Sequence, residues 1–279
     1  MSFGLASRPK NLPKRSKRGG FLHFPPWSNL ESVDSRDRRH GIEFANGARS
    51  PFGKGKVSMS DDESRGEAPS ERTRVKHYNW LARYDRKTVE DILDATPLAH
   101  VGCLMNGVPF VTPTFFWREN DRVYWHGAAA GRMFKVLEQQ DICLTVSLLD
   151  GLVVARSAFN FNCNFRSVML LGRAELIRDE TVKVKKLRNF VNRLIPGEWE
   201  RLRPIHEREV KVTALASMSI AEASCKVRIG PPLDDDEDYA FPSWAGVIPI
   251  RYQVLPPEAD PRNLPDTEMP DDILKFHLG

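Results

Sequence analysis

The feature that most constrains the fold is a series of short apolar segments separated by turn sequences. The segment FVTPTFFW (110–117) alternates along its length, which is typical of a strand with one packed face. MNGV (105–108) and RENDR (118–122) supply turn residues of the kind that join antiparallel neighbours. On this pattern we predict strands at 98–104, 108–117, 121–126, 141–149, 151–156, 165–178, 211–220 and 245–252.

Helical patterns are fewer than strand patterns. We predict helices at 85–95, 131–140 and 180–195, the last with Val184, Leu187, Val191 and Leu194 at helical spacing. Because strands and helices do not alternate regularly, a parallel doubly wound sheet is disfavoured. No GxGxxG or GxxxxGK[ST] loop is present, so a Rossmann or P-loop nucleotide site has no support. The pattern indicates an α+β, mainly β fold, with a barrel and peripheral helices.

Charge divides the chain into two parts. Residues 1–58 hold 12 Lys/Arg against 4 Asp/Glu, a net charge of +8, and the remaining residues hold 29 against 33, a net charge of −4. The basic part has no apolar periodicity, so we predict a disordered arm at 1–74. A transit peptide, a nucleic-acid-binding arm and a true translation start at Met59 are three interpretations of it. We expect the barrel domain at 75–255 and a Pro/Asp-rich tail at 256–279.

Several classes of protein are disfavoured by composition. No apolar run reaches the roughly 20 residues that a membrane span needs, so no membrane association is expected. The four cysteines are widely spaced, form no CxxC pair and do not cluster with histidines. We therefore expect reduced thiols, no metal site and a cytoplasmic protein.

A polar loop between two apolar runs, in the segment 148–172, has the composition of an anion site. It carries two arginines and two serines among several amides: Asp150, Arg156, Ser157, Asn160, Asn162, Asn164, Arg166 and Ser167. The arginine fork matches phosphate oxygens, and hydroxyls and amides satisfy the remaining acceptors. The alternative is a long hairpin with a polar tip.

A second candidate anion site is the corner from Trp125 to Arg132, which runs from a strand through small residues into a predicted helix. Backbone amides at a helix N-terminus attract anions, and small side chains allow a phosphate to approach closely. Arg132 could complete the clamp. The alternative is a plain strand–helix connection with a solvent-facing arginine and a structural His126.

Six segments in one order resemble a known family. They are YDRKTVEDILDATPLAHVG (84–102), PFVTPTFFW (109–117), VYWHGAAAGRMF (123–134), 149–172, EASCKVRIGPP (222–232) and WAGVIPI (244–250), and their span covers about 60% of the chain. Together they resemble the flavin-nucleotide-binding branch of the pyridoxamine 5'-phosphate oxidase-like family. The resemblance implies an FMN-binding split β-barrel, a homodimer with FMN at its interface, and an oxidoreductase acting on a small molecule.

The resemblance also implies which residues bind FMN. Arg132 and Arg166 are expected at the phosphate, Thr112 and Thr114 along the ring, and Trp244 over the ring, often from the partner subunit. The full set of expected cofactor-binding residues is Thr112, Thr114, His126, Gly127, Gly131, Arg132, Asn164, Arg166, Ser167, Lys226, Arg228 and Trp244. No catalytic residue is assigned.

The chain departs from the family pattern in one loop. Relatives often have FHHSxNYRSV there, and this chain has Asn160 and Phe161 in place of the histidine pair and Phe165 in place of the tyrosine. The loss of an imidazole removes a proton donor near neutral pH. This favours the competing hypothesis of a non-catalytic flavin- or haem-binding protein on the same scaffold. A nucleic-acid-binding protein has the least support, because the basic arm has few aromatic residues and the rest of the chain is acidic.

Overall fold

A computed structural model describes residues 65–278, which belong to one compact unit, Gly55–Gly279. Of the arm predicted at 1–74, residues 1–64 lie outside the described residues. Residues 65–74 lie against the domain, because the Tyr84 amide donates to the Arg65 carbonyl (2.7 Å) and Thr73 is buried.

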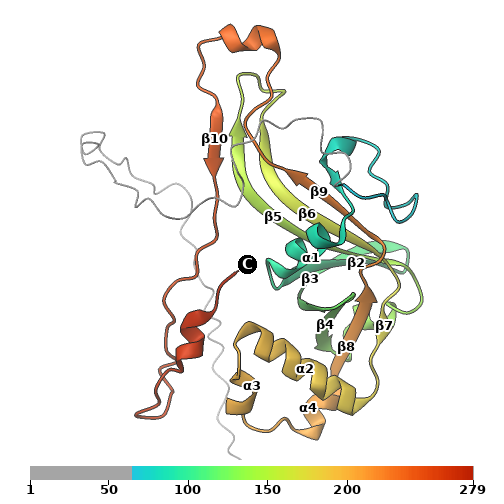
Figure 1. Cartoon of the computed structure of the whole chain (residues 1–279). Coiled ribbons are helices and arrows are strands. Elements are labelled where there is room, and N and C mark those ends of the chain that lie inside the picture. Colours follow the sequence, from blue (N-terminus) through green and yellow to red (C-terminus); the bar gives the residue numbers. More distant parts are fainter. Residues whose placement is uncertain (1–64, 279) are drawn as a thin grey trace, which may run out of the picture. The chain divides into compact units, whose positions relative to one another are not determined.

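The domain is built on a ten-stranded antiparallel sheet (Figure 1). The strand order is β1-β9-β6-β5-β2-β3-β4-β8-β7, and β10 adds to β5. Within residues 65–278 no ladder joins β7 to β1, so the barrel is split rather than closed. The strands are β1 Ala82–Arg83, β2 Leu98–Met105, β3 Val108–Glu119, β4 Arg122–Ala128, β5 Ile142–Val154, β6 Asn162–Gly172, β7 Glu175–Leu176, β8 Thr213–Ser219, β9 Ala223–Arg228 and β10 Gly246–Pro249.

Four α-helices and four 3₁₀ turns accompany the sheet in the described part of the chain. They are α1 Arg86–Asp94, α2 Glu180–Leu194, α3 Glu198–Arg201, α4 Glu207–Val212, η2 Asn79–Leu81, η3 Met133–Lys135, η4 Asp236–Ala240 and η5 Asp271–Lys275. Both long helices begin at an aspartate N-cap, where the Asp85 carboxylate accepts from the Thr88 amide and Asp179 accepts from the Val182 amide, each at 2.8 Å. Such caps satisfy amide groups that would otherwise have no partner.

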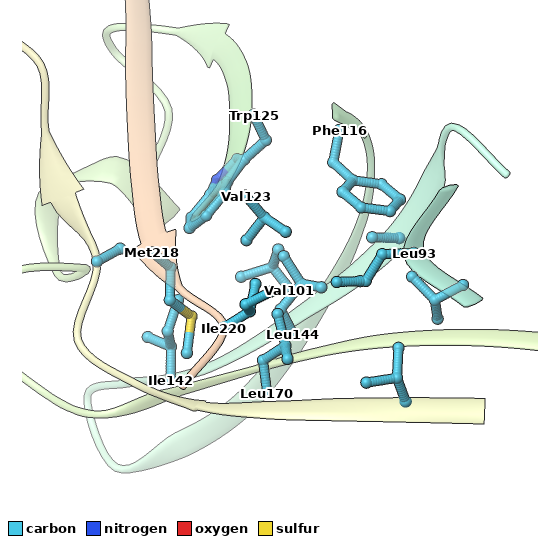
Figure 2. Close-up of a cluster of buried hydrophobic side chains, with 14 of the residues drawn as sticks. Leu93, Val101, Phe116, Val123, Trp125, Ile142, Leu144, Leu170, Met218 and Ile220 are labelled. Carbon is cyan, nitrogen blue, oxygen red and sulfur yellow. The ribbon is translucent and has the colours of Figure 1, made fainter. Parts of the chain in front are cut away.

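The core lies within the curve of the sheet (Figure 2). Trp125 and Phe116 come from paired positions on β4 and β3 and point toward apolar side chains from other strands. Helix α1 contributes Ile92 and Leu93 to the same cluster. A smaller cluster on the outer face of β3, β4 and β8 is covered by Phe190 of α2.

The fold class is confirmed as α+β, mainly β, but some local predictions are corrected. The segment predicted as one strand at 165–178 forms two strands, β6, which ends at Gly172, and the short β7 at Glu175–Leu176. The segments predicted as strands 141–149 and 151–156 form the single strand β5, which has a bulge between Leu149 and Gly151. Residues 131–140 do not form an α-helix. Their amides bond three residues back, as Lys135 does to Arg132 and Gln139 to Val136, so only the short 3₁₀ turn η3 results. Met133 and Phe134 of this segment are nevertheless buried in the core.

Among the helices of residues 65–278, none combines the length and the apolar character that crossing a bilayer requires.

Candidate functional site

The outer face of β5, β6 and β9 carries a row of polar side chains. The sheet register places Ser147 opposite Ser167 and Ser167 opposite Lys226. The next row pairs Thr145 with Met169 and Met169 with Ser224. Because directly opposed residues project from the same face of a sheet, the register gathers four hydroxyls and one ammonium on one surface.

This surface forms the floor of an open pocket of about 530 Å³, which we call the first lobe. Its wall is the segment Arg72–His77, which adds basic side chains. The lining residues include no carboxylate: they are Arg72, Thr73, Arg74, Val75, Lys76, His77, Thr145, Ser147, Ser167, Val168, Met169, Ser224 and Lys226. The lobe therefore offers hydroxyl donors and positive charge, the groups that bind phosphate oxygens.

Lys226 differs from the other lysine and the arginines of the first lobe, because no described carboxylate forms an ion pair with it. Arg72 is paired with Glu222 and Asp141, at 3.0 and 2.7 Å, and these carboxylates raise the pKa of its guanidinium. Arg74 and Lys76 both pair with Glu71. Within residues 65–278, the Lys226 ammonium has no carboxylate partner. An unpaired ammonium beside hydroxyls favours the binding of an anion.

A second lobe of about 370 Å³ adjoins the first, and Ser147 lines both. Its lining includes Leu98, His100 and Leu149 together with the ion pair between Arg166 and Asp150. Arg166 donates to both carboxylate oxygens of Asp150, at 2.9 and 2.8 Å, and this pairing raises the pKa of the guanidinium. In the second lobe the charge of Arg166 is therefore already paired, whereas Lys226 of the first lobe has no such partner among the described residues.

Ser167, Lys226 and Arg166 are the predicted residues that line this two-lobed groove. Asn164 and Arg228 do not line it. Arg228 donates to the side-chain amide oxygen (Oδ1) of Asn164 (2.5 Å), and the Asn164 side-chain amide donates to the Gly230 carbonyl (3.1 Å). These two residues thus hold the loop after β9, and burial lowers the pKa of Arg228.

The predicted residues at the end of β4 lie elsewhere. The Arg132 guanidinium lies over the Phe110 ring at 5.2 Å. A Cβ at Gly127 would be 2.7 Å from the Phe134 ring, and one at Gly131 would be 2.9 Å from the Ala128 carbonyl. Close packing thus explains both glycines without a ligand. Since η3 is a single 3₁₀ turn, it does not provide the helix N-terminus expected there.

The structure does not bring Arg132 and Arg166 together. Phe110, beneath Arg132, pairs with Cys103 near one end of β2. Arg166 pairs with Leu148 of β5. In the register of β5 against β2, Leu148 lies next to the opposite end of β2, near Leu98. At about 3.3 Å per residue, the two ends are roughly 20 Å apart. A single phosphate cannot contact both side chains within one chain.

His126 lies beneath helix α2. Its ring is 5.0 Å from Phe190 and 6.3 Å from Trp117. Burial lowers the pKa of His126, so its imidazole is neutral near pH 7. Its buried Nδ1 has no hydrogen-bond partner among the described residues. A neutral, unpartnered imidazole is a potential ligand for a metal centre.

The remaining predicted residues lie outside the groove. Thr112 and Thr114 are half-buried on β3, opposite the buried Val101 and Ala99. Trp244 is 66% exposed just before β10, with its ring over Gly246.

Sequence reasoning missed several residues that line the groove. Thr145 and Ser147 are two apart on β5, so alternation along that strand could have identified them. His100 could be found in the same way on β2. The segment 72–77 could not, because it spans the boundary predicted between the arm (1–74) and the barrel domain (75–255), and only tertiary packing places it here.

The fold and the groove define a split-barrel protein with a candidate phosphate-binding lobe, and comparison with known proteins agrees with the fold. A family model described as pyridoxamine 5'-phosphate oxidase matches residues 85–227. The chain belongs to this family.

Two solved structures are similar over most of their length. The flavocytochrome Anf3 from Azotobacter vinelandii is 82% identical, with a TM-score of 0.76, and the match covers 77% of this chain and 100% of that one. The FAD and haem binding protein from Mycobacterium smegmatis is 32% identical, with a TM-score of 0.67, and the match covers 70% of this chain and 97% of that one. None of the curated proteins compared with the chain matches it significantly.

Proposed function

We propose that this protein binds a flavin nucleotide in the two-lobed groove and acts as a flavin-dependent oxidoreductase on a small molecule. The observation that carries the proposal is the first lobe, where the unpaired Lys226 lies beside the hydroxyls of Thr145, Ser147, Ser167 and Ser224. This set suits the phosphate of a nucleotide. The bound flavin would supply hydride or electron transfer, and the protein would position it.

The sequence resemblance implies FMN, and the groove favours a larger flavin. Two lobes of about 530 and 370 Å³ that meet at Ser147 offer room for a ligand longer than FMN. The Mycobacterium smegmatis relative is described as binding FAD. We therefore propose FAD as the main cofactor, with FMN as the shorter ligand of the same lobes.

The absorption spectrum of the purified protein tests the proposal. We expect flavin bands that a nicotinamide donor bleaches, and mass spectrometry of the released cofactor should identify FAD. A colourless protein that takes up neither added FAD nor added FMN would refute flavin binding. Release of FMN alone would refute the choice of FAD.

We also propose a homodimer. The outer faces of β2 and β3 expose apolar side chains, among them Leu98 (46%), Val111 (66%) and Phe115 (54%). A continuous exposed apolar face typically marks an interface. A second copy would cover it and could bring Trp244 close to the partner's groove. Light scattering that reports a monomer with full flavin content would contradict this proposal.

Haem binding is a second candidate, alone or beside flavin. Both relatives named above are described as haem proteins or flavocytochromes, and His126 is neutral, unpartnered at Nδ1 and surrounded by aromatic rings. A neutral imidazole is a common haem ligand. We expect a Soret band that is lost in His126→Ala while the flavin bands persist. A Soret band that persists in His126→Ala would exclude His126 as the ligand.

A further inference from the structure

The C-terminal segment 250–278, which we call the strap, is attached to the domain at its two ends. At the first end, β10 pairs with Gly151–Val154 of β5, and the Ile250 amide then donates to the Asp150 carbonyl (3.0 Å). Asp150 is the same residue that binds Arg166 through its side chain. The strap thus begins at the edge of the second lobe, and Ile250, Arg251 and Tyr252 line that lobe.

The middle of the strap makes few contacts. Residues 251–269 are all exposed and form no strand or helix. The apolar side chains of Leu255 and Leu264 are 70% and 78% exposed. In Figure 1 this part runs from β10 as an extended trace before η5. A segment with so little buried surface can separate from the domain at low cost in free energy.

The far end of the strap returns to the domain in a small cup, whose lining is made mainly of apolar residues and also includes Asp94 and Arg193. Phe276, His277 and Leu278 line this cup together with side chains from α1, β3 and α2, namely Leu93, Phe116, Trp117, Phe190 and Leu194. Arg201 of α3 also pairs with Asp272 of η5 at 3.3 Å. The cup shares Ala95, Thr96 and Leu278 with the second lobe. Both ends of the strap therefore border the same lobe.

We propose that the strap is a lid whose far end, seated through Phe276 and Leu278, controls entry to and release from the second lobe. This inference rests on the flavin-binding function proposed above. The ends differ in strength, because β10 is held by a ladder of backbone hydrogen bonds, and the far end by the side chains in the cup and one partly exposed ion pair. The strap would therefore first leave the cup, while its β10 end stays attached to β5 and acts as the hinge. Such segments commonly set the rate of ligand release.

The experiment compares Phe276→Asp and Leu278→Asp with the wild-type protein and with Leu274→Asp. Leu274 is 62% exposed on η5, so its substitution adds the same charge without emptying the cup. FAD release after dilution is followed by flavin fluorescence. Hydrogen exchange of residues 271–278 reports strap opening independently of flavin. Thermal unfolding checks that each variant remains folded. If Phe276→Asp does not fold, Leu278→Asp alone tests the proposal, because Leu278 is already 37% exposed and tolerates a charge more easily.

The proposal predicts faster exchange at the far end and at least about tenfold faster FAD release in both cup variants, because a carboxylate placed against the apolar side chains of the cup opposes seating. Leu274→Asp should behave as wild type. Faster exchange with unchanged FAD release would overturn the proposal, and so would a release rate that depends on protein concentration, which indicates exchange of straps between copies.

Failure of the flavin proposal has a separate signature. If the wild-type protein takes up no FAD, flavin binding is refuted and the lid is judged by thiol labelling of Thr96→Cys, a half-buried position that lines both the cup and the second lobe, with the buried Cys225 as internal reference. Faster labelling at this position when a cup substitution is added would support the lid, and an unchanged rate would overturn it.

Discussion

Lys226→Glu is expected to lose at least about 100-fold in affinity for FAD and FMN. A hydrogen bond to a charged group contributes roughly 1.5–3 kcal/mol, which corresponds to about 10- to 100-fold, and the reversed charge adds repulsion to that loss. Lys226 has no carboxylate partner among the described residues, so no intramolecular ion pair is broken. The fold should therefore be unaffected. Fluorescence titration with FAD, FMN and riboflavin measures the effect.

Riboflavin is the internal control, because it lacks the phosphate and should bind wild type and variant nearly alike. Lys185→Glu is the matched protein control. Lys185 is exposed on α2 and does not line the groove, so the same change of charge there should leave flavin affinity unaltered. If Lys226→Glu weakens riboflavin as much as FAD, the residue supports the ring or the fold, and the phosphate assignment is wrong.

Trp125→Ala is expected to lower the free energy of unfolding by roughly 3–5 kcal/mol, because removal of a large buried aromatic leaves a cavity. Trp125 is completely buried and belongs to the cluster of core side chains (Figure 2). Its Nε1 has no hydrogen-bond partner among the described residues, so the whole contribution comes from packing. Chemical denaturation followed by circular dichroism measures it.

Trp125→Phe provides the comparison. It keeps much of the apolar volume and removes a buried donor that has no acceptor, so it should cost clearly less than the alanine variant. Equal losses in the two variants would show that the indole nitrogen has a partner, such as a buried water, that contributes to stability.

Much of the fold could be predicted because it follows from local pattern. Val89, Ile92 and Leu93 have helical spacing and form the buried face of α1, and alternation in 98–104 corresponds to β2. The helix predicted at 131–140 was wrong, because its apolar residues face the core through a single 3₁₀ turn rather than a regular helix. Burial was thus predictable there, and the hydrogen-bond pattern was not.

The site was harder to predict, because a binding surface depends on which strands are neighbours. Ser167 and Lys226 were both proposed, but only the β6–β9 register makes them direct neighbours. Arg166 and Arg132 have similar chemistry in the sequence, and the sheet places them near opposite ends of β2. The segment that contains Gly127 and Gly131 resembled a phosphate-binding loop in the sequence. In the structure, the Phe134 ring and the Ala128 carbonyl leave no room for a Cβ at these two positions.

By itself the sequence determined the kind of fold, the family and the residue types available for anion binding. Period-two alternation and turn residues are local properties, and a chain carries them before it folds. Tertiary structure alone decided that Ser147, Ser167 and Lys226 form one surface. It also decided that Arg166 forms an ion pair with Asp150 and that the C-terminal strap reaches the second lobe. These contacts join residues far apart in the chain, and strand register and packing, rather than local pattern, bring them together.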